Sequence, residues 1–142
     1  MKRFKQITSL YLILIRDGKI LLLRRINTGY EDGKYGLVAG HVDEGESITN
    51  AAIREAREES GVGIDLHDLF VKTTMHRKQN DERVDFFFEV TKWSGEIQNA
   101  EPHKCDDLRW FPLSDLPLNT IPYIREAIEC YQNGIFYSEF GW

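Results

Sequence analysis

The strongest constraint on the fold of this chain is a helical segment, Ser47 to Ser60, that has glycines on both sides. Ser47 is a suitable N-cap, and Gly61 is placed to end the helix. At 1.5 Å per residue the helix would be about 20 Å long. Its small and apolar residues share one face: Ala52, Ile53 and Ala56. Because such a face packs closely on a sheet, the segment predicts a helix covered by β-structure.

Strand-like segments lie on both sides of this helix. Residues Leu10 to Arg25 form two apolar runs around an Asp17-Gly18 pair, which is typical of a β-hairpin. The other expected strands are Tyr35 to Ala39, Leu69 to His76, Val84 to Thr91 and Leu108 to Phe111, and Pro122 to Gln132 is expected to be a second helix. The predicted order is therefore mixed, β-β-β-α-β-β-β-α. The aromatic tail Phe136 to Trp142 is expected to dock on the body of the protein.

The length and composition predict one domain over residues 1–142. With 42% hydrophobic and 29% charged residues, the chain resembles soluble globular proteins. Its net charge of −5 argues against an extended nucleic-acid-binding surface, because such surfaces need clustered Lys and Arg. A small anionic ligand remains possible through a local patch. The composition does not decide the oligomeric state, and a homodimer remains possible.

No segment predicts insertion in a membrane or secretion. The longest apolar runs, Leu10 to Ile15 and Ile20 to Leu23, are much too short to span a bilayer. The N-terminus lacks an apolar region that ends at a small-residue cleavage site, so we expect a cytoplasmic protein. Cys105 and Cys130 are far apart and belong to no CxxC pair, which predicts semi-buried thiols and neither a disulfide framework nor a zinc cluster.

The acidic residues of the first helix indicate a cation site. Glu55, Glu58 and Glu59 fall within an arc about 100° wide, because spacings of three and four residues share a face. A solvated acidic face is the alternative. Against that alternative, acids in the last turn oppose the helix dipole, at a cost of about 0.3 to 1 kcal/mol. Mg²⁺ would turn the repulsion into attraction, since it takes a few carboxylates together with water and phosphate oxygens.

These residues carry a resemblance to a known family. The chain reads Gly40-His-Val-Asp-Glu-Gly-Glu46, then seven residues, then Arg54-Glu-Ala-Arg-Glu-Glu-Ser-Gly-Val62. This resembles the Nudix box, G-x5-E-x7-R-E-U-x-E-E-x-G-U with U apolar, at every defined position. The elements before and after it also follow the Nudix order across nearly the whole chain. The resemblance implies an α/β fold, the Nudix α/β/α sandwich with a central mixed β-sheet.

The resemblance also implies a set of site residues. Glu55, Glu58 and Glu59 would bind the metal and serve as catalytic carboxylates, with Arg54 and Glu46 supporting them. The backbone carbonyl of Ala39 would be a further metal ligand, and Gly40 would contact the substrate. The chain has Val38-Ala39-Gly40 where the common pattern has Pro-Gly-Gly, which leaves the orientation of this carbonyl open. Mg²⁺ is the expected metal, with Mn²⁺ as an alternative.

The expected reaction is in-line attack of a metal-activated water on phosphorus in a nucleoside diphosphate linked to a further group X. The general base would be Glu55 or the loop residue Glu101. For Glu101 a solvated loop carboxylate is the alternative. Arg25 resembles a phosphate-contacting arginine of MutT-like members, with an exposed strand end as the alternative. Aromatic residues that could stack on a base are Trp110, Phe111, Tyr35 and Phe87, although aromatics in strands more often belong to the core.

The substrate class follows mainly from exclusion. Between Gly63 and Ala100 there is no Pro and no Tyr. In this region ADP-ribose-cleaving members resemble one another by a Pro, and dinucleoside polyphosphate-cleaving members by a Tyr. The chain therefore looks most like MutT-type nucleoside triphosphate pyrophosphohydrolases, which release a nucleoside monophosphate and pyrophosphate. Another Nudix pyrophosphatase, acting on a nucleotide sugar or ADP-ribose, and a non-catalytic nucleotide-sensing Nudix domain are the alternatives.

Overall fold

The computed structural model describes all residues from Met1 to Trp142. Eight strands form one mixed sheet, and its main path runs β3-β2-β1-β6-β5-β8, with β4 paired to β1 and β7 paired to β2. The strands are β1 (Ile7–Arg16), β2 (Lys19–Arg25), β3 (Tyr35–Gly36), β4 (Val38–His41), β5 (Phe70–Lys78), β6 (Glu82–Val90), β7 (Cys105–Pro112) and β8 (Tyr137–Phe140). The helices are α1 (Ile48–Ser60), α2 (Pro122–Gln132) and a short 3₁₀ helix, η1 (Leu66–Asp68).

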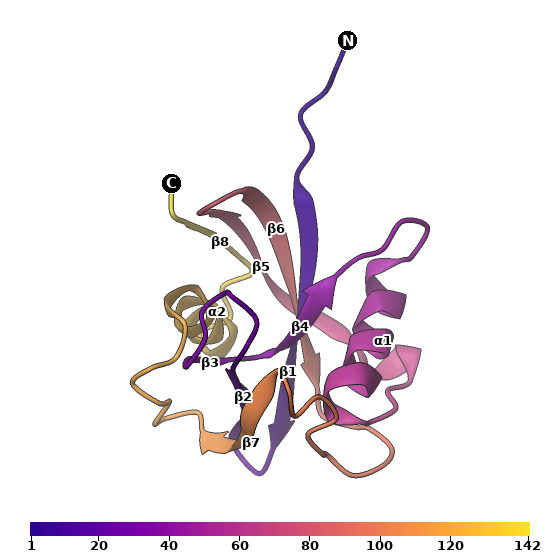
Figure 1. Ribbon diagram of the computed structural model, residues 1–142, viewed down its shortest axis with the longest axis vertical. Coiled ribbons are helices and arrows are strands. Elements are labelled where there is room, and N and C mark those ends of the chain that lie inside the picture. The colour runs from indigo at the N-terminus through magenta and orange to yellow at the C-terminus, as the bar shows by residue number, and fades with distance from the viewer.

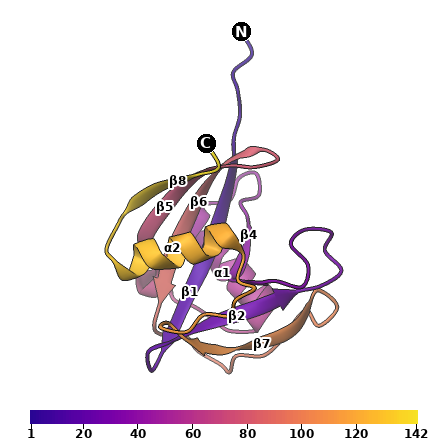
Figure 2. The ribbon, with the colours of Figure 1, turned by 90° about the vertical axis from the view of Figure 1, so that its left-hand side faces the viewer.

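The two α-helices cover opposite faces of the sheet (Figures 1 and 2). α1 packs on β4 and β1, and α2 lies across the other face, next to β5 and β8. Each face has its own apolar core, one containing Leu10, Leu12 and Phe88, the other Ile13, Phe87 and Ile128. The predicted α/β/α sandwich with a central mixed sheet is confirmed.

The long strand β1 organises the site, because one of its edges is shared by two partners. Near its C-terminal end it pairs with β2, and along Ser9 to Leu12 it pairs with β4 in antiparallel register. The expected single strand Tyr35 to Ala39 is therefore split: β3 pairs with β2, and β4 pairs with β1. In this register Ala39 lies opposite Tyr11. The split brings the glycine-containing end of β4 beside the centre of the sheet.

Helix α1 begins and ends as the sequence predicts. The Ser47 side chain accepts a hydrogen bond from the Asn50 N–H, and Gly61 caps the other end at φ 76° in the left-handed region. Ala51, Ala52 and Ala56 are fully buried against the sheet. Their small size lets the helix backbone approach β4 closely, so the Glu59 side chain in the last turn reaches the backbone of that strand.

The aromatic tail docks on the body, as predicted, and does so as an additional strand. β8 pairs in parallel with β5, with Thr74 opposite Tyr137. Trp142 donates from its indole N–H to the carbonyl of His76 at 3.0 Å, and its ring lies against the His76 imidazole. The sequence did not predict this strand, because the segment of four residues is too short to show a clear alternation.

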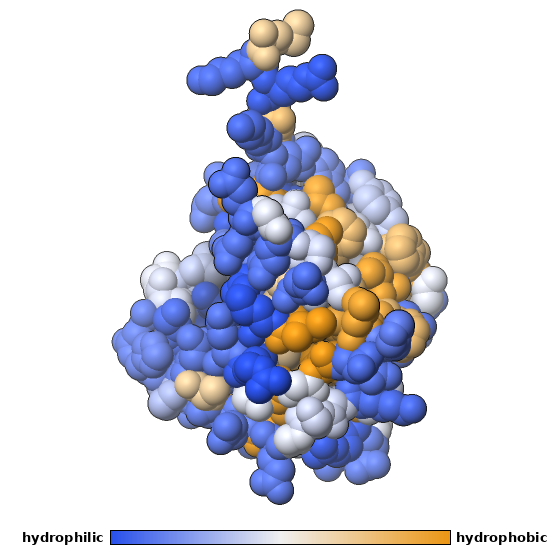
Figure 3. Space-filling view, turned by 90° about the vertical axis from the view of Figure 1, so that its right-hand side faces the viewer, coloured by the Kyte–Doolittle hydropathy of each residue, from blue (hydrophilic) through white to orange (hydrophobic).

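The remaining sequence predictions concern the cysteines and the membrane. Cys105 and Cys130 are both free and buried. None of the helices is both long and apolar enough to cross a bilayer. On the side that carries α1, hydrophobic residues form an area bordered by hydrophilic ones (Figure 3).

Candidate functional site

The site is built where the C-terminal half of α1 meets β4. Glu59 accepts a hydrogen bond at 2.8 Å from the backbone N–H of Ala39, which anchors the carboxylate to the sheet. Burial raises the pKa of Glu59 to about 8, and this effect outweighs the opposing hydrogen bond. A carboxylate held in this way is costly to ionise, unless a cation compensates its charge.

Gly40 makes room for the second carboxylate. A methyl group built on Gly40 would overlap the carboxyl group of Glu55, so only glycine leaves the space that this side chain occupies. The Glu55 side chain is 13% exposed, and burial raises its pKa. Both carboxylates thus lie against the end of β4. Glu59 contacts the Ala39 amide, and Glu55 occupies the space beside Gly40.

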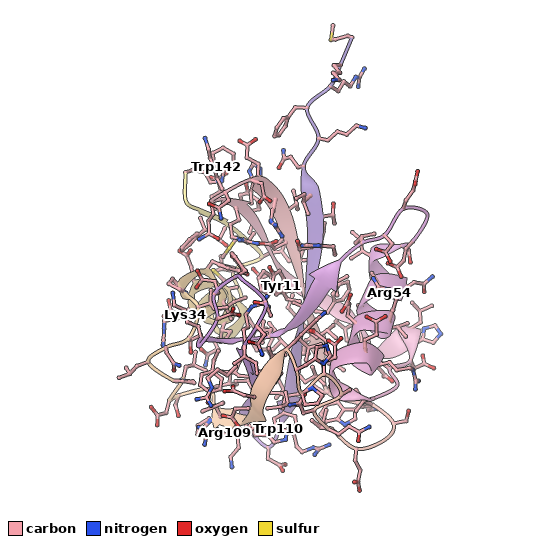
Figure 4. All side chains as sticks on the ribbon, viewed as in Figure 1. Tyr11, Lys34, Arg54, Arg109, Trp110 and Trp142 are labelled. Atoms are coloured by element: carbon pink, nitrogen blue, oxygen red, sulfur yellow. The ribbon has the colours of Figure 1, made fainter.

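Arg54 connects the helix to the loop that precedes it (Figure 4). Its guanidinium donates to both carboxylate oxygens of Glu46, at 2.8 and 3.0 Å, and to Glu55 at 2.7 Å. It also donates to the His41 carbonyl at 3.1 Å. The hydrogen bond from Arg54 lowers the pKa of Glu46 to about 2. Arg54 also pairs with Glu58 at 3.3 Å, a longer contact than those to Glu46 and Glu55.

The cluster carries more negative than positive charge. The carboxylates of Glu46, Glu55 and Glu58 share one guanidinium, and Glu59 has only a backbone N–H as partner. As the side chains stand, no three of them converge on one point as metal ligands. The donor set nevertheless fits a hard divalent cation, because it consists of carboxylate oxygens, two of them with pKa values raised by burial. The Glu58 side chain is half exposed and free to turn toward such an ion.

A cavity of about 730 Å³ opens beside the carboxylates. Every residue predicted to contact the substrate or act as base lines it: Arg25, Gly40, Glu55 and Glu101. Arg25 donates from Nε to the Tyr30 carbonyl at 2.8 Å, so this arginine is fixed within the cavity wall and is not a free strand end. Glu101 lies 4.0 Å from the Lys104 ammonium, which also lines the cavity. The cavity therefore joins the acidic cluster to basic side chains, among them Arg25 and Lys104.

Several cavity residues were not predicted from the sequence. Tyr11, Tyr30, Arg83 and Tyr123 all line the cavity, although they come from separate parts of the chain. Arg83 donates to the His41 ring at 2.8 Å, and burial together with this guanidinium lowers the pKa of His41. The only sequence signal for the two buried tyrosines was a polar hydroxyl within an otherwise apolar strand or helix face.

The aromatic residues that we considered for base stacking are not in the cavity wall. Phe87 is fully buried under α2, and Tyr35 is 3% exposed and packs against Phe111. Trp110 stacks on Trp93 and pairs with Leu21 of β2. Their interpretation as core or packing residues is thus the one that the structure supports.

A family model and related proteins match this chain over most of its length. The model described as NUDIX domain matches residues 6–130. The chain is 30% identical over 117 residues to the NAD-capped RNA hydrolase NudC of Stutzerimonas stutzeri (strain A1501), a match that covers 82% of this chain and 40% of that relative. It is 31% identical over 123 residues to a putative 8-oxo-dGTP diphosphatase of Bacillus subtilis (strain 168), covering 87% of this chain and 77% of the relative.

Solved structures agree with these matches. A MutT NUDIX hydrolase from Burkholderia pseudomallei superposes with a TM-score of 0.82 at 29% identity, over 89% of this chain and 98% of the other. A MutT protein from Methanosarcina mazei Go1 superposes with a TM-score of 0.79 at 20% identity, over 92% and 97%, and this match shows the fold alone. This chain spans less than half the length of the NudC relative.

Proposed function

The chain belongs to the Nudix family, and we propose that it is a divalent-metal-dependent hydrolase that cleaves a phosphoanhydride bond in a nucleoside diphosphate-linked substrate. The observation that carries the proposal is the excess of carboxylates at the rim of a cavity that also holds basic side chains. A purely structural cluster would balance its charges. This one leaves Glu59 without a cationic partner, with its pKa raised to about 8.

Each side chain then has a defined task. Glu55, Glu58 and Glu59 would hold the metal, with the Ala39 carbonyl as a further ligand. The ion pair between Arg54 and Glu46 would hold the loop before α1 against the helix. When bound, Mg²⁺ or Mn²⁺ would lower the pKa of a water molecule and neutralise charge on phosphate oxygens. Arg25 and Lys104 line the same cavity, where they would bind phosphate oxygens.

The proton of the attacking water needs an acceptor near the metal ligands. Glu55 and Glu101 both line the cavity, so each is a candidate for the general base. The Glu101 carboxylate has one ion-pair partner, the Lys104 ammonium at 4.0 Å, and makes no contact with Arg54. Glu55 accepts a hydrogen bond from Arg54 and would have to divide its lone pairs between that contact, the metal and the water.

The finer proposal is a nucleoside triphosphate pyrophosphohydrolase that gives a nucleoside monophosphate and pyrophosphate. It is supported by the match over 77% of the putative 8-oxo-dGTP diphosphatase and by the MutT-type solved structure. The relatives include an ADP-ribose pyrophosphatase of Methanocaldococcus jannaschii at 29% identity, so ADP-ribose and nucleotide sugars are the alternative substrates. A non-catalytic sensor is disfavoured, because every carboxylate of the cluster is present. The cytoplasmic location stays a prediction, and the oligomeric state stays open.

The experiment is a panel of nucleoside triphosphates, ADP-ribose and nucleotide sugars, incubated with and without Mg²⁺ and scored for pyrophosphate, phosphate and monophosphate. We expect metal-dependent release of pyrophosphate from at least one triphosphate. Glu58→Gln should lower kcat/KM by about 1000-fold, because a metal ligand contributes several kcal/mol to the transition state. Glu44→Gln is the matched control, since Glu44 is an exposed glutamate in the loop before α1 and has no partner in the cluster. Equal turnover in Glu58→Gln and the control would sink the mechanism.

A further inference from the structure

We propose that Tyr11 and Tyr123 form a hydrogen-bond donor pair that reads a keto oxygen on the nucleobase of the substrate. Both tyrosines line the cavity, one from β1 and one from α2, and their hydroxyl oxygens lie 3.1 Å apart. Their exposed fractions are 6% and 3%. The inference rests on the proposed function, since it assumes that a nucleotide enters this cavity.

One O–H group of the Tyr11–Tyr123 pair is left without an acceptor. A guanidinium can only donate, so Arg77 Nη2, at 3.2 Å, must use a lone pair of the Tyr11 hydroxyl oxygen. One of the two tyrosine O–H groups then donates to the other oxygen. Whichever direction this bond takes, one O–H group has no acceptor within the protein. A buried donor without a partner costs about 1 to 3 kcal/mol, so the pair favours a ligand that brings an acceptor.

The same network fixes the donor in its protonated form. Burial raises the pKa of Tyr11 to about 12, and burial also raises the pKa of Tyr123. Both hydroxyls therefore keep their hydrogen at neutral pH. Tyr11 is held by stacking on Phe87 at 4.6 Å between ring centroids, and Arg77 lies over the Tyr123 ring at 3.8 Å. Neither ring can turn away without breaking these contacts.

The charge behind the pair indicates a neutral acceptor. The guanidinium of Arg77 is paired with Asp85 at 2.7 Å, and these side chains are 3% and 0% exposed. Because the pair cancels its own charge, the hydroxyls offer a donor without a net positive field. A phosphate group would need an uncompensated cation, whereas a base carbonyl needs only a donor. Arg25 and Lys104, near the carboxylates, are better placed for phosphate.

The surroundings of the pair match a planar ring that continues from the phosphates. Leu37, Ile121 and Ile124 line the cavity next to Tyr123 and provide apolar walls. Tyr11 lies opposite Ala39 across the β1–β4 ladder, and the Ala39 amide holds Glu59. A nucleotide whose phosphates contact the acidic cluster would thus place its sugar and base along the sheet toward the tyrosines. Figure 4 places Tyr11 at the centre of the molecule, with Arg54 on α1 to one side.

The test measures binding without turnover, so it does not depend on catalysis. α,β-Methylene triphosphates of inosine and of purine riboside differ in the 6-keto group, and those of uridine and 2-pyrimidinone riboside differ in the 4-keto group. Calorimetry in the presence of Mg²⁺ gives the affinity ratio for each pair. We expect wild-type protein to bind the keto analogue about tenfold more tightly or better in at least one pair. In the double variant Tyr11→Phe/Tyr123→Phe this ratio should fall to about one.

Tyr131→Phe is the matched control, because Tyr131 is a half-buried tyrosine of the same helix whose hydroxyl donates to Glu89. It should keep the wild-type ratio. A wild-type ratio near one for both pairs overturns the proposal even if the double variant does not fold. The proposal is also overturned if removal of a ribose hydroxyl weakens binding and removal of the keto group does not. Absence of turnover of every substrate in the panel, ADP-ribose and nucleotide sugars included, would reject the proposed function and leave the binding ratios interpretable.

Discussion

Two arginine-centred clusters lie near β1, and they treat charge in opposite ways. Arg77 is almost completely buried, and each of its five N–H groups has an acceptor on Asp85, Tyr11, Tyr30 or Gln79. Arg54 is 29% exposed and faces several carboxylates at once. One arginine is matched to one aspartate, and the other is outnumbered by glutamates. A balanced buried pair indicates a structural role, whereas an unbalanced cluster beside a cavity indicates a site for a cation.

The largest expected effect breaks the balanced cluster. Asp85→Asn leaves the Arg77 charge buried without a counter-ion and should lower the free energy of unfolding by about 3 to 5 kcal/mol. Urea unfolding followed by circular dichroism measures the change. The double variant Arg77→Met/Asp85→Leu removes both charges and should be close to wild type in stability. A loss in Asp85→Asn below about 1 kcal/mol would mean that the pair does not carry the role assigned to it.

The next effect concerns the space for a carboxylate in the unbalanced cluster. Gly40→Ala should lower kcat/KM by about 100-fold, because the added methyl group displaces the Glu55 carboxyl group and misplaces a catalytic side chain. The unfolding free energy should change far less than in Asp85→Asn. Steady-state kinetics and urea unfolding on the same preparation separate the two quantities. Unchanged kinetics in Gly40→Ala would show that Glu55 does not need its present position.

A third prediction uses the metal as a probe of charge balance. Mg²⁺ at about ten times its dissociation constant should raise the free energy of unfolding by about 1.4 kcal/mol, since it binds the folded acidic cluster and not the unfolded chain. Sodium chloride at equal ionic strength should not reproduce the gain. Glu58→Gln should reduce the gain, and Glu44→Gln should retain it. A gain of the same size in both variants would place the cation elsewhere.

The smallest effect is a dependence on pH. The pKa of Glu59 in the folded protein, about 8, lies above the ordinary value of 4.5, so the folded state holds a proton that the unfolded state has released. This contribution to stability is complete below about pH 4.5 and is lost as the pH rises toward 8. In metal-free protein the loss between pH 7 and 8 should be at most about 1 kcal/mol. Glu59→Gln should remove it, as thermal unfolding at both pH values would show.

Local patterns in the sequence predicted many of the elements. Helix α1 has a side-chain cap at Ser47 and a left-handed glycine at Gly61, and both signals act within a few residues. The Asp17-Gly18 turn likewise fixes the hairpin of β1 and β2. The strand expected from Tyr35 to Ala39 was predicted in one piece, because nothing local reveals that β1 shares one edge between two partners. The short strand β8 depends in the same way on a partner distant in the sequence.

The site shows the same division. The spacing of Glu55, Glu58 and Glu59 on one helix determined that these acids share a face, because helical geometry is local. The sequence by itself also determined the family, through the glycines and acids of residues 40 to 62. Only the tertiary structure decided that Gly40 leaves space for Glu55 and that Tyr11 meets Tyr123 across 112 positions of the chain. The physical reason is that a buried donor or charge is defined by what surrounds it in space, and packing between distant segments sets those surroundings.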